Sequence, residues 1–169
     1  YSEDSKTPAE FNITKYLKMG ENSISVQVFR WCDGSYLEDQ DFFRLSGIER
    51  DVYLYSTPKV HIRDFFAKAI FDSLYQNGVL DFNAQITSQL NEKTDGYKLE
   101  VKVMDGDKEI ATQTSTLNLI DGKATVNFRK IIPAIKIWSA ETPNLYPLIL
   151  ILKKEDKEIE ITSIKIGFR

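Results

Sequence analysis

The chain has 169 residues, of which 42% are hydrophobic and 12% aromatic, and its formal net charge at pH 7 is −3. This length suits one large domain or two small ones. Lysine and arginine are scattered rather than clustered, which argues against a nucleic-acid partner. The longest apolar run, Pro147 to Leu152, is far too short to cross a bilayer, so no membrane role is expected.

Cys32 is the only cysteine, so no internal disulfide can form. This favours a cytoplasmic, reducing compartment and leaves the periplasm open. The chain starts at Tyr1 without an initiator methionine, and YSEDSKTPAE contains no apolar secretion segment. We therefore expect a piece of a longer polypeptide.

Alternation with a period of two residues runs through almost the whole chain and predicts an all-β fold. The first strands are predicted at 11–17, 22–30 and 48–55, and Pro58 ends the pattern. A unit below roughly 60 residues without a disulfide or metal buries too little surface to be stable alone. Residues 1–57 are thus predicted to be the last strands of a larger β-domain.

Residues 58–169 have the pattern of an immunoglobulin-like β-sandwich of about seven short strands. Each buried Leu, Ile or Phe contributes roughly 1.5–3 kcal/mol, so two inward faces can stabilise the domain without a disulfide. The predicted strands cover 60–71, 80–86, 99–103, 110–119, 124–128, 148–152 and 159–168.

The last of these strands changes phase along its length. Ile161 is odd-numbered, whereas Ile164 and Ile166 are even-numbered, so one face stays buried only if an extra residue is inserted. We predict a β-bulge near Thr162 and Ser163.

The run RWCDGSYLEDQDFFRLSGIERDV, residues 30 to 52, is unusually rich in charges and aromatic rings. Three interpretations are open: paired carboxylates for catalysis, a ligand-contacting loop, or a loop held by ion pairs and turn caps. Its rings Trp31, Phe42 and Phe43 more often fill a core than stack on a sugar. The charged residues are Asp33, Glu38, Asp39, Asp41, Glu49 and Asp51 with Arg30, Arg44 and Arg50.

Other catalytic constellations have little support. His61 is the sole histidine, so neither a Ser-His-Asp triad nor a histidine-rich metal site is indicated, and a structural role is expected. Cys32 has no histidine close in sequence, which favours a buried, inert thiol. The glycines are dispersed over turns and form no phosphate-binding loop.

Residues 31–54, WCDGSYLEDQDFFRLSGIERDVYL, closely resemble the signature stretch of the large bacterial β-galactosidases of glycoside hydrolase family 2. FNITKYLKMGENSISVQVFRW resembles the strand pair before that motif, and IWSAETPNLYPL the segment that ends the family's first sandwich domain. The closing IKIGFR is similar to the entry into the catalytic barrel. The resemblance covers essentially the whole chain.

The resemblance implies the end of a jelly-roll sugar-binding domain, residues 1–57, followed by the first immunoglobulin-like sandwich, residues 58–169. In that family a (β/α)₈ barrel follows and carries both catalytic glutamates, so the chain itself holds no catalytic residue and is expected to be inactive. The parent would be a retaining hydrolase of terminal β-galactosides such as lactose, assembled as a homo-oligomer, with sodium and magnesium as cofactors.

The same resemblance assigns one substrate-binding residue, the aspartate of the WxDGSY motif, which is Asp33. It is implied to bind galactosyl hydroxyls and to help coordinate sodium in the intact enzyme. The loop would be held by Glu38, Asp39, Asp41, Arg44 and Arg50. The chain departs from the family pattern at Phe43, usually Trp, and at Glu49, usually aromatic, which predicts altered packing there.

Two alternatives remain beside a β-galactosidase fragment. One is a structural immunoglobulin-like interaction domain, and the other is a free-standing carbohydrate-binding module. The module needs exposed aromatic platforms, whereas most rings of the sandwich are predicted at core-facing positions. These rings are Phe65, Phe66, Phe71, Tyr75, Phe82, Tyr97 and Phe128.

Overall fold

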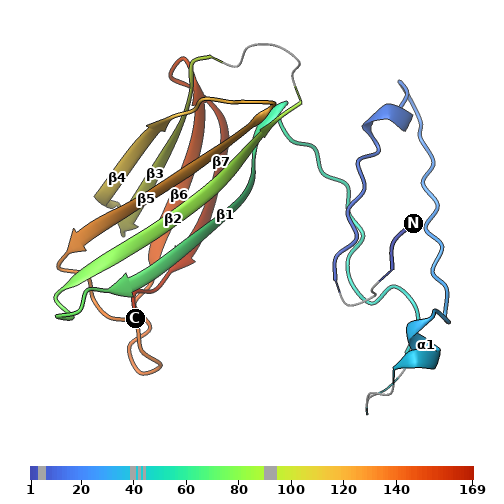
Figure 1. The fold of residues 1–169 in the computed structure, drawn as a ribbon, viewed down its shortest axis with the longest axis horizontal. Coiled ribbons are helices and arrows are strands. Elements are labelled where there is room, and N and C mark those ends of the chain that lie inside the picture. The colour runs from blue at the N-terminus through green and yellow to red at the C-terminus, as the bar shows by residue number, and fades with distance from the viewer. Residues whose placement is uncertain (4–6, 39–40, 42, 44, 90–94) are drawn as a thin grey trace. The chain divides into compact units, whose positions relative to one another are not determined.

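The computed structural model describes residues 1–3, 7–38, 41, 43, 45–89 and 95–169. The chain divides into two compact units, Tyr1–Leu54 and Tyr55–Arg169, which Figure 1 shows as ribbons. No helix in the described ranges is long and apolar enough to cross a membrane.

The second unit is a sandwich of two antiparallel sheets (Figure 1). One sheet has the strand order β1-β2-β5 and the other the order β4-β3-β6-β7. The immunoglobulin-like sandwich predicted from the sequence is confirmed, and each predicted strand has a counterpart. The strands are β1 (Val60–Phe71), β2 (Asn77–Ser88), β3 (Tyr97–Asp105), β4 (Lys108–Thr116), β5 (Lys123–Pro133), β6 (Tyr146–Lys154) and β7 (Lys157–Ile166).

The core lies between the two sheets, because alternate residues of each strand face inward. Strand β2 contributes Leu80 and Ile86, and β6 contributes Leu148 and Leu150, all of them fully buried. Aromatic stacking adds to this packing, since the rings of Phe82 and Phe128 lie 4.9 Å apart. The domain therefore has a continuous apolar core without a disulfide.

Three β-bulges shift the phase of edge strands, one each in β1, β4 and β7, and the extra residue in β4 is Ile110. In β1 the register passes from Ile62 to Asp64, so Arg63 is the extra residue. In β7, Glu160 pairs with Leu152 and Glu158 pairs with Lys153. Ile159 lies between them and is the extra residue. The Ile62 N–H, next to the first bulge, donates a hydrogen bond of 2.8 Å to the Glu160 carboxylate.

The bulge predicted in the last strand exists, but its predicted position was wrong. Pairing is regular at Thr162 and Ser163, and the extra residue comes earlier, at Ile159. Consequently Ile161 lies on the outer face of the sheet and is 56% exposed, while Ile166 is buried. The physical reason is that the position of a bulge depends on how the strand pairs with its neighbour. The sequence of one strand alone does not show where the extra residue lies.

The first unit contains the short 3-10 helix η1 (Thr14–Tyr16) and the helical turn α1 (Gly34–Leu37). Between these two, the Asn22 side chain closes a turn: its oxygen accepts the Lys18 N–H at 3.0 Å, and its amide nitrogen donates to the Lys18 carbonyl at 2.9 Å. The strands predicted at 11–17, 22–30 and 48–55 are not formed among the described residues, and Figure 1 shows extended chain there. A strand needs a hydrogen-bonded neighbour, and no described segment of this unit supplies one.

The outer face of the larger sheet carries a charge network centred on Glu100. Its carboxylate pairs with Lys153 and, at 3.2 Å, with Lys102, which also lies 3.0 Å from Glu109. The hydrogen bond from Lys153, followed by that from Lys102, holds the pKa of Glu100 below its ordinary value. Deprotonated Glu100 therefore stabilises the fold above the pKa of the unfolded chain, and this contribution is lost as the pH falls through the lower folded-state pKa.

We expect Glu100→Gln to lower the free energy of unfolding by about 0.5–1 kcal/mol at pH 7, the range of partly exposed ion pairs. At a pH below the folded-state pKa, both proteins carry a neutral group at this position and the difference should vanish. Urea unfolding followed by circular dichroism at both pH values measures this. Glu141→Gln, at an exposed carboxylate, is the matched control, and an equal loss at acidic pH would contradict the expectation.

Candidate functional site

The candidate site is the α1 turn, where the sequence Cys-Asp-Gly-Ser-Tyr folds back on itself. The Asp33 carbonyl accepts the Tyr36 N–H at 3.0 Å and the Leu37 N–H at 3.2 Å, and the Ser35 N–H donates to the Cys32 carbonyl at 3.0 Å. Asp, Gly and Ser are turn-forming residues, so the local sequence accounts for the turn. The turn fixes the backbone on both sides of Asp33.

Among the residues that the structure describes, none occupies the Asp33 side chain. Asp33 occupies the N-cap position of α1 with φ −57° and ψ −39°, but its carboxylate makes no capping hydrogen bond. The residue is exposed, and within the described part of the chain no ion pair or hydrogen bond occupies its side chain. An unpaired carboxylate of this kind accepts hydrogen bonds from hydroxyl groups and offers hard oxygen ligands to a cation.

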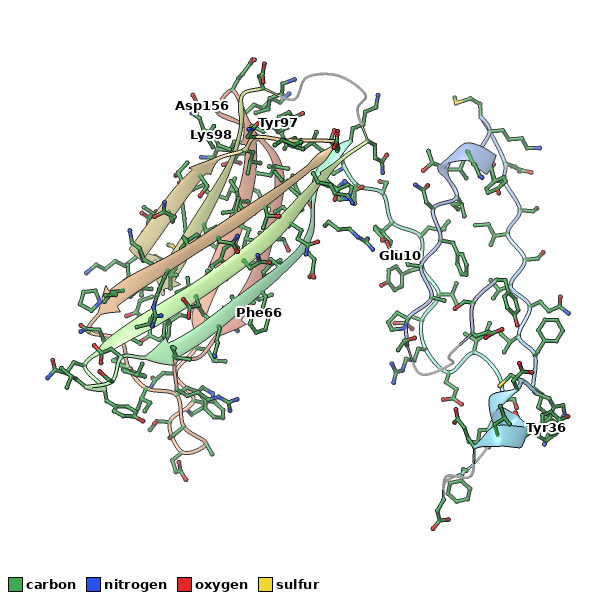
Figure 2. The ribbon with its side chains drawn as sticks, viewed as in Figure 1. Glu10, Tyr36, Phe66, Tyr97, Lys98 and Asp156 are labelled. Atoms are coloured by element: carbon green, nitrogen blue, oxygen red, sulfur yellow. The ribbon has the colours of Figure 1, made fainter. Side chains whose placement is uncertain are left out.

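Aromatic rings surround this turn in the sequence and are exposed. Tyr36, labelled in Figure 2, lies on α1 itself, and Phe43 is 90% exposed. Trp31 is also exposed, with the Arg30 guanidinium 4.8 Å from its ring centre. The expectation that Trp31 and Phe43 fill a core was wrong, because this unit buries none of its described residues. Phe42 lies outside the described residues.

The residues predicted to hold the loop are only partly described. Glu38, Asp41 and Arg50 are all exposed, whereas Asp39 and Arg44 lie outside the described residues. Within the described ranges, no ion pair joins Asp41 to Arg50. The locking role assigned to these five residues therefore stays a prediction.

The sequence also predicted a structural role for His61 and a buried thiol for Cys32. His61 is buried, and its Nδ1 lies 3.1 Å from the Pro58 carbonyl, so its ring joins the strand to the preceding segment. Cys32 is exposed, so the buried thiol expected from the sequence was wrong. Its Sγ is 3.8 Å from the Ser35 hydroxyl. Cys32 is exposed for the same reason as Trp31, because the described residues of this unit form no buried core.

The described residues form no group of three or more His, Cys, Asp or Glu side chains that could hold a metal ion. Asp33 alone therefore fits a cation only as one ligand among several. The remaining ligands of such a site would have to come from other parts of a larger protein.

Both units of the chain match known protein families. Residues 1–58 match "Glycosyl hydrolases family 2, sugar binding domain", and residues 60–169 match "Glycosyl hydrolases family 2". The β-galactosidase of Priestia megaterium is 49% identical over 100% of this chain, and that of Streptococcus thermophilus is 42% identical. The chain spans only 17% and 16% of the length of these two relatives.

Solved structures agree on the fold. A glycosyl hydrolase family 2 member from Bacteroides cellulosilyticus superimposes with a TM-score of 0.60, covering 66% of this chain and 16% of that one at 20% identity. The β-glucuronidase of Parabacteroides merdae gives a TM-score of 0.54 at 23% identity, again over 66% of this chain. Such low identities speak for the shared fold alone. Together with the family matches over both units, they show that this chain belongs to glycosyl hydrolase family 2.

Proposed function

We propose that this chain is a non-catalytic part of a β-galactosidase that hydrolyses terminal β-galactosides such as lactose. The proposal is supported by similarity to β-galactosidases over the full length of the chain. The observation that carries the site assignment is the exposed Asp33 carboxylate, for which the described residues of its unit supply no partner. In a larger protein such a group is available to a pocket formed by another domain.

In this proposal Asp33 binds hydroxyl groups of the galactosyl unit. Sugar hydroxyls donate hydrogen bonds to a carboxylate, and a charged acceptor makes these bonds stronger than a neutral one. Asp33 also supplies one oxygen ligand to a sodium ion, which has the hard-cation preference for carboxylate and carbonyl oxygen. Magnesium is proposed for the parent protein as well, without a ligand among the described residues of this chain.

The exposed rings around α1 support a second part of the proposal. Trp31, Tyr36 and Phe43 each expose an aromatic ring within one short segment, and such a concentration of exposed rings is typical of a surface that binds another domain. We expect a neighbouring catalytic barrel to cover it and so to bring the two catalytic glutamates close to Asp33. The sandwich then acts as a rigid support, and the parent assembles as a homo-oligomer.

The first test separates the chain from its parent. The full-length parent should hydrolyse a chromogenic β-galactoside, whereas the 169-residue chain should give no rate above the buffer background. Turnover by the chain alone, surviving repurification and absent from a mock preparation, would refute its non-catalytic role. Inactivity of the parent on β-galactosides would refute the substrate assignment.

The second test concerns Asp33. In the full-length enzyme, Asp33→Asn should lower kcat/KM by roughly 10- to 150-fold, because a hydrogen bond to a charged group contributes about 1.5–3 kcal/mol. KM should rise, kcat should fall, and the dependence of the rate on sodium should disappear. Glu21→Gln, at an exposed carboxylate of the same unit, is the control. A near-normal kinetic profile with sodium dependence intact would reject the role of Asp33.

A further inference from the structure

The outer face of the sheet β1-β2-β5 carries one exposed aromatic ring beside a group of polar side chains, while a separate apolar row of Ile70, Val79 and Ile131 crosses the same sheet. Phe66 of β1 is 65% exposed and is labelled in Figure 2, whereas its neighbour Phe65 packs against Phe82 in the core at 6.3 Å. The cause is the bulge at Arg63, which shifts the inward positions of β1 from even to odd residue numbers. The prediction that Phe66 faces the core was wrong for this reason.

An open hollow of about 410 Å³ lies beside this ring. It spans the sheet β1-β2-β5, since Asn83 of β2 is paired with Phe66 on one side and with Asn127 of β5 on the other. Asp81 of β2 is likewise paired with Lys68 of β1 and with Arg129 of β5. The outer-face side chains that line the hollow are Phe66, Lys68, Asp81, Asn83, Asn127 and Arg129.

These polar groups are arranged as alternating donors and acceptors. The Asn83 amide donates to the Asn127 side-chain oxygen at 2.6 Å, and within the described residues no other hydrogen bond engages either amide. Arg129 Nε lies 3.7 Å from the Asp81 carboxylate. Each amide thus keeps hydrogen-bonding capacity toward solvent, within reach of the exposed ring.

We propose that this face of the sandwich binds a neutral saccharide. The apolar C–H face of a pyranose ring stacks on an aromatic ring, while its hydroxyls exchange hydrogen bonds with amides and carboxylates. A strongly anionic ligand fits less well, because Asp81 offsets one of the two cations, Lys68 and Arg129. The site lies on the sandwich, so it is additional to the role of Asp33 and does not depend on it.

The test is a titration of the 169-residue chain with galactose, lactose and cellotetraose, followed by backbone amide chemical shifts in NMR. We expect shift changes concentrated at 66–68, 81–83 and 127–129 for at least one sugar, with Kd in the millimolar range, as a single open platform implies. Sodium chloride should leave Kd unchanged, because the ligand is neutral. Glycerol, which has hydroxyls but no ring face, should produce no such pattern.

Variants decide whether the ring is responsible. Phe66→Ala should raise Kd at least about ten-fold, whereas Phe66→Tyr keeps the platform and should bind normally. Ile161→Ala removes a comparably exposed side chain from the other sheet and should also bind normally. The proposal is overturned if no sugar shifts these amides, if Phe66→Ala binds like the unaltered chain, or if sodium chloride abolishes the shifts.

Discussion

Phe168→Ala should destabilise the sandwich by about 3–5 kcal/mol, the usual cost of removing a buried aromatic ring. Phe168 has no exposed surface, and its ring meets the edge of Tyr146 at 5.9 Å and 78°. A Cβ added at Gly78 would lie 2.9 Å from the Phe168 ring and equally close to Ile135. The ring therefore fills its space completely, and its removal leaves a cavity that this tight packing cannot easily close.

The same residue also anchors the loop between β5 and β6. The Trp138 N–H donates to the Phe168 carbonyl at 2.8 Å, and the Lys136 N–H donates to the Tyr146 hydroxyl at 2.9 Å. Gly167 brings the backbone so close to Trp138 that an added Cβ would be 2.9 Å from the indole. Loss of the Phe168 ring should weaken both of these hydrogen bonds. We therefore expect the loss of stability to lie in the upper part of the range given above.

Urea unfolding followed by circular dichroism measures this change, with the midpoint falling and the slope unchanged. Phe66→Ala is the matched control, because the same ring is removed from an exposed position and should change stability by no more than about 0.5 kcal/mol. Equal losses at the two phenylalanines would show that burial does not determine the cost. They would also show that the inward and outward faces of the sandwich are assigned incorrectly.

Period-two alternation predicted the sandwich strands well, because each strand has one buried and one solvent-facing side. Strand β1 begins and ends at the predicted residues, Val60 and Phe71. The bulges were harder, since a bulge depends on the register between two strands and not on one strand alone. The phase change of β7 was visible in its isoleucines, whereas nothing in VHIRDFFAKAIF shows whether Phe65 or Phe66 faces inward.

The same limit applies to the candidate sites. The Asp-Gly-Ser turn that presents Asp33 is encoded locally, so the turn could be predicted from the sequence. The exposure of Cys32 and Trp31 could not, because it reflects the surfaces available to the first unit and not the residues themselves. The Phe66 surface was missed because its outward position follows from the bulge at Arg63.

Separate production of the two units should give opposite results. Residues 55–169 should unfold cooperatively, because they contain the whole core between the two sheets. Residues 1–54 should show the spectrum of an unfolded chain and no cooperative transition. Among its described residues this unit has no strand and no buried side chain, and Cys32 cannot form an internal disulfide.

Circular dichroism and amide hydrogen exchange on the two pieces test this expectation. The apolar row Ile24, Val26 and Val28 is about half exposed in this unit, as expected for apolar residues that lack a covering layer. Protected amides in isolated 1–54 would mean that the unit has a core of its own. Asp33 would then belong to a self-sufficient module, and its proposed role in a pocket completed by another domain would lose its main structural reason.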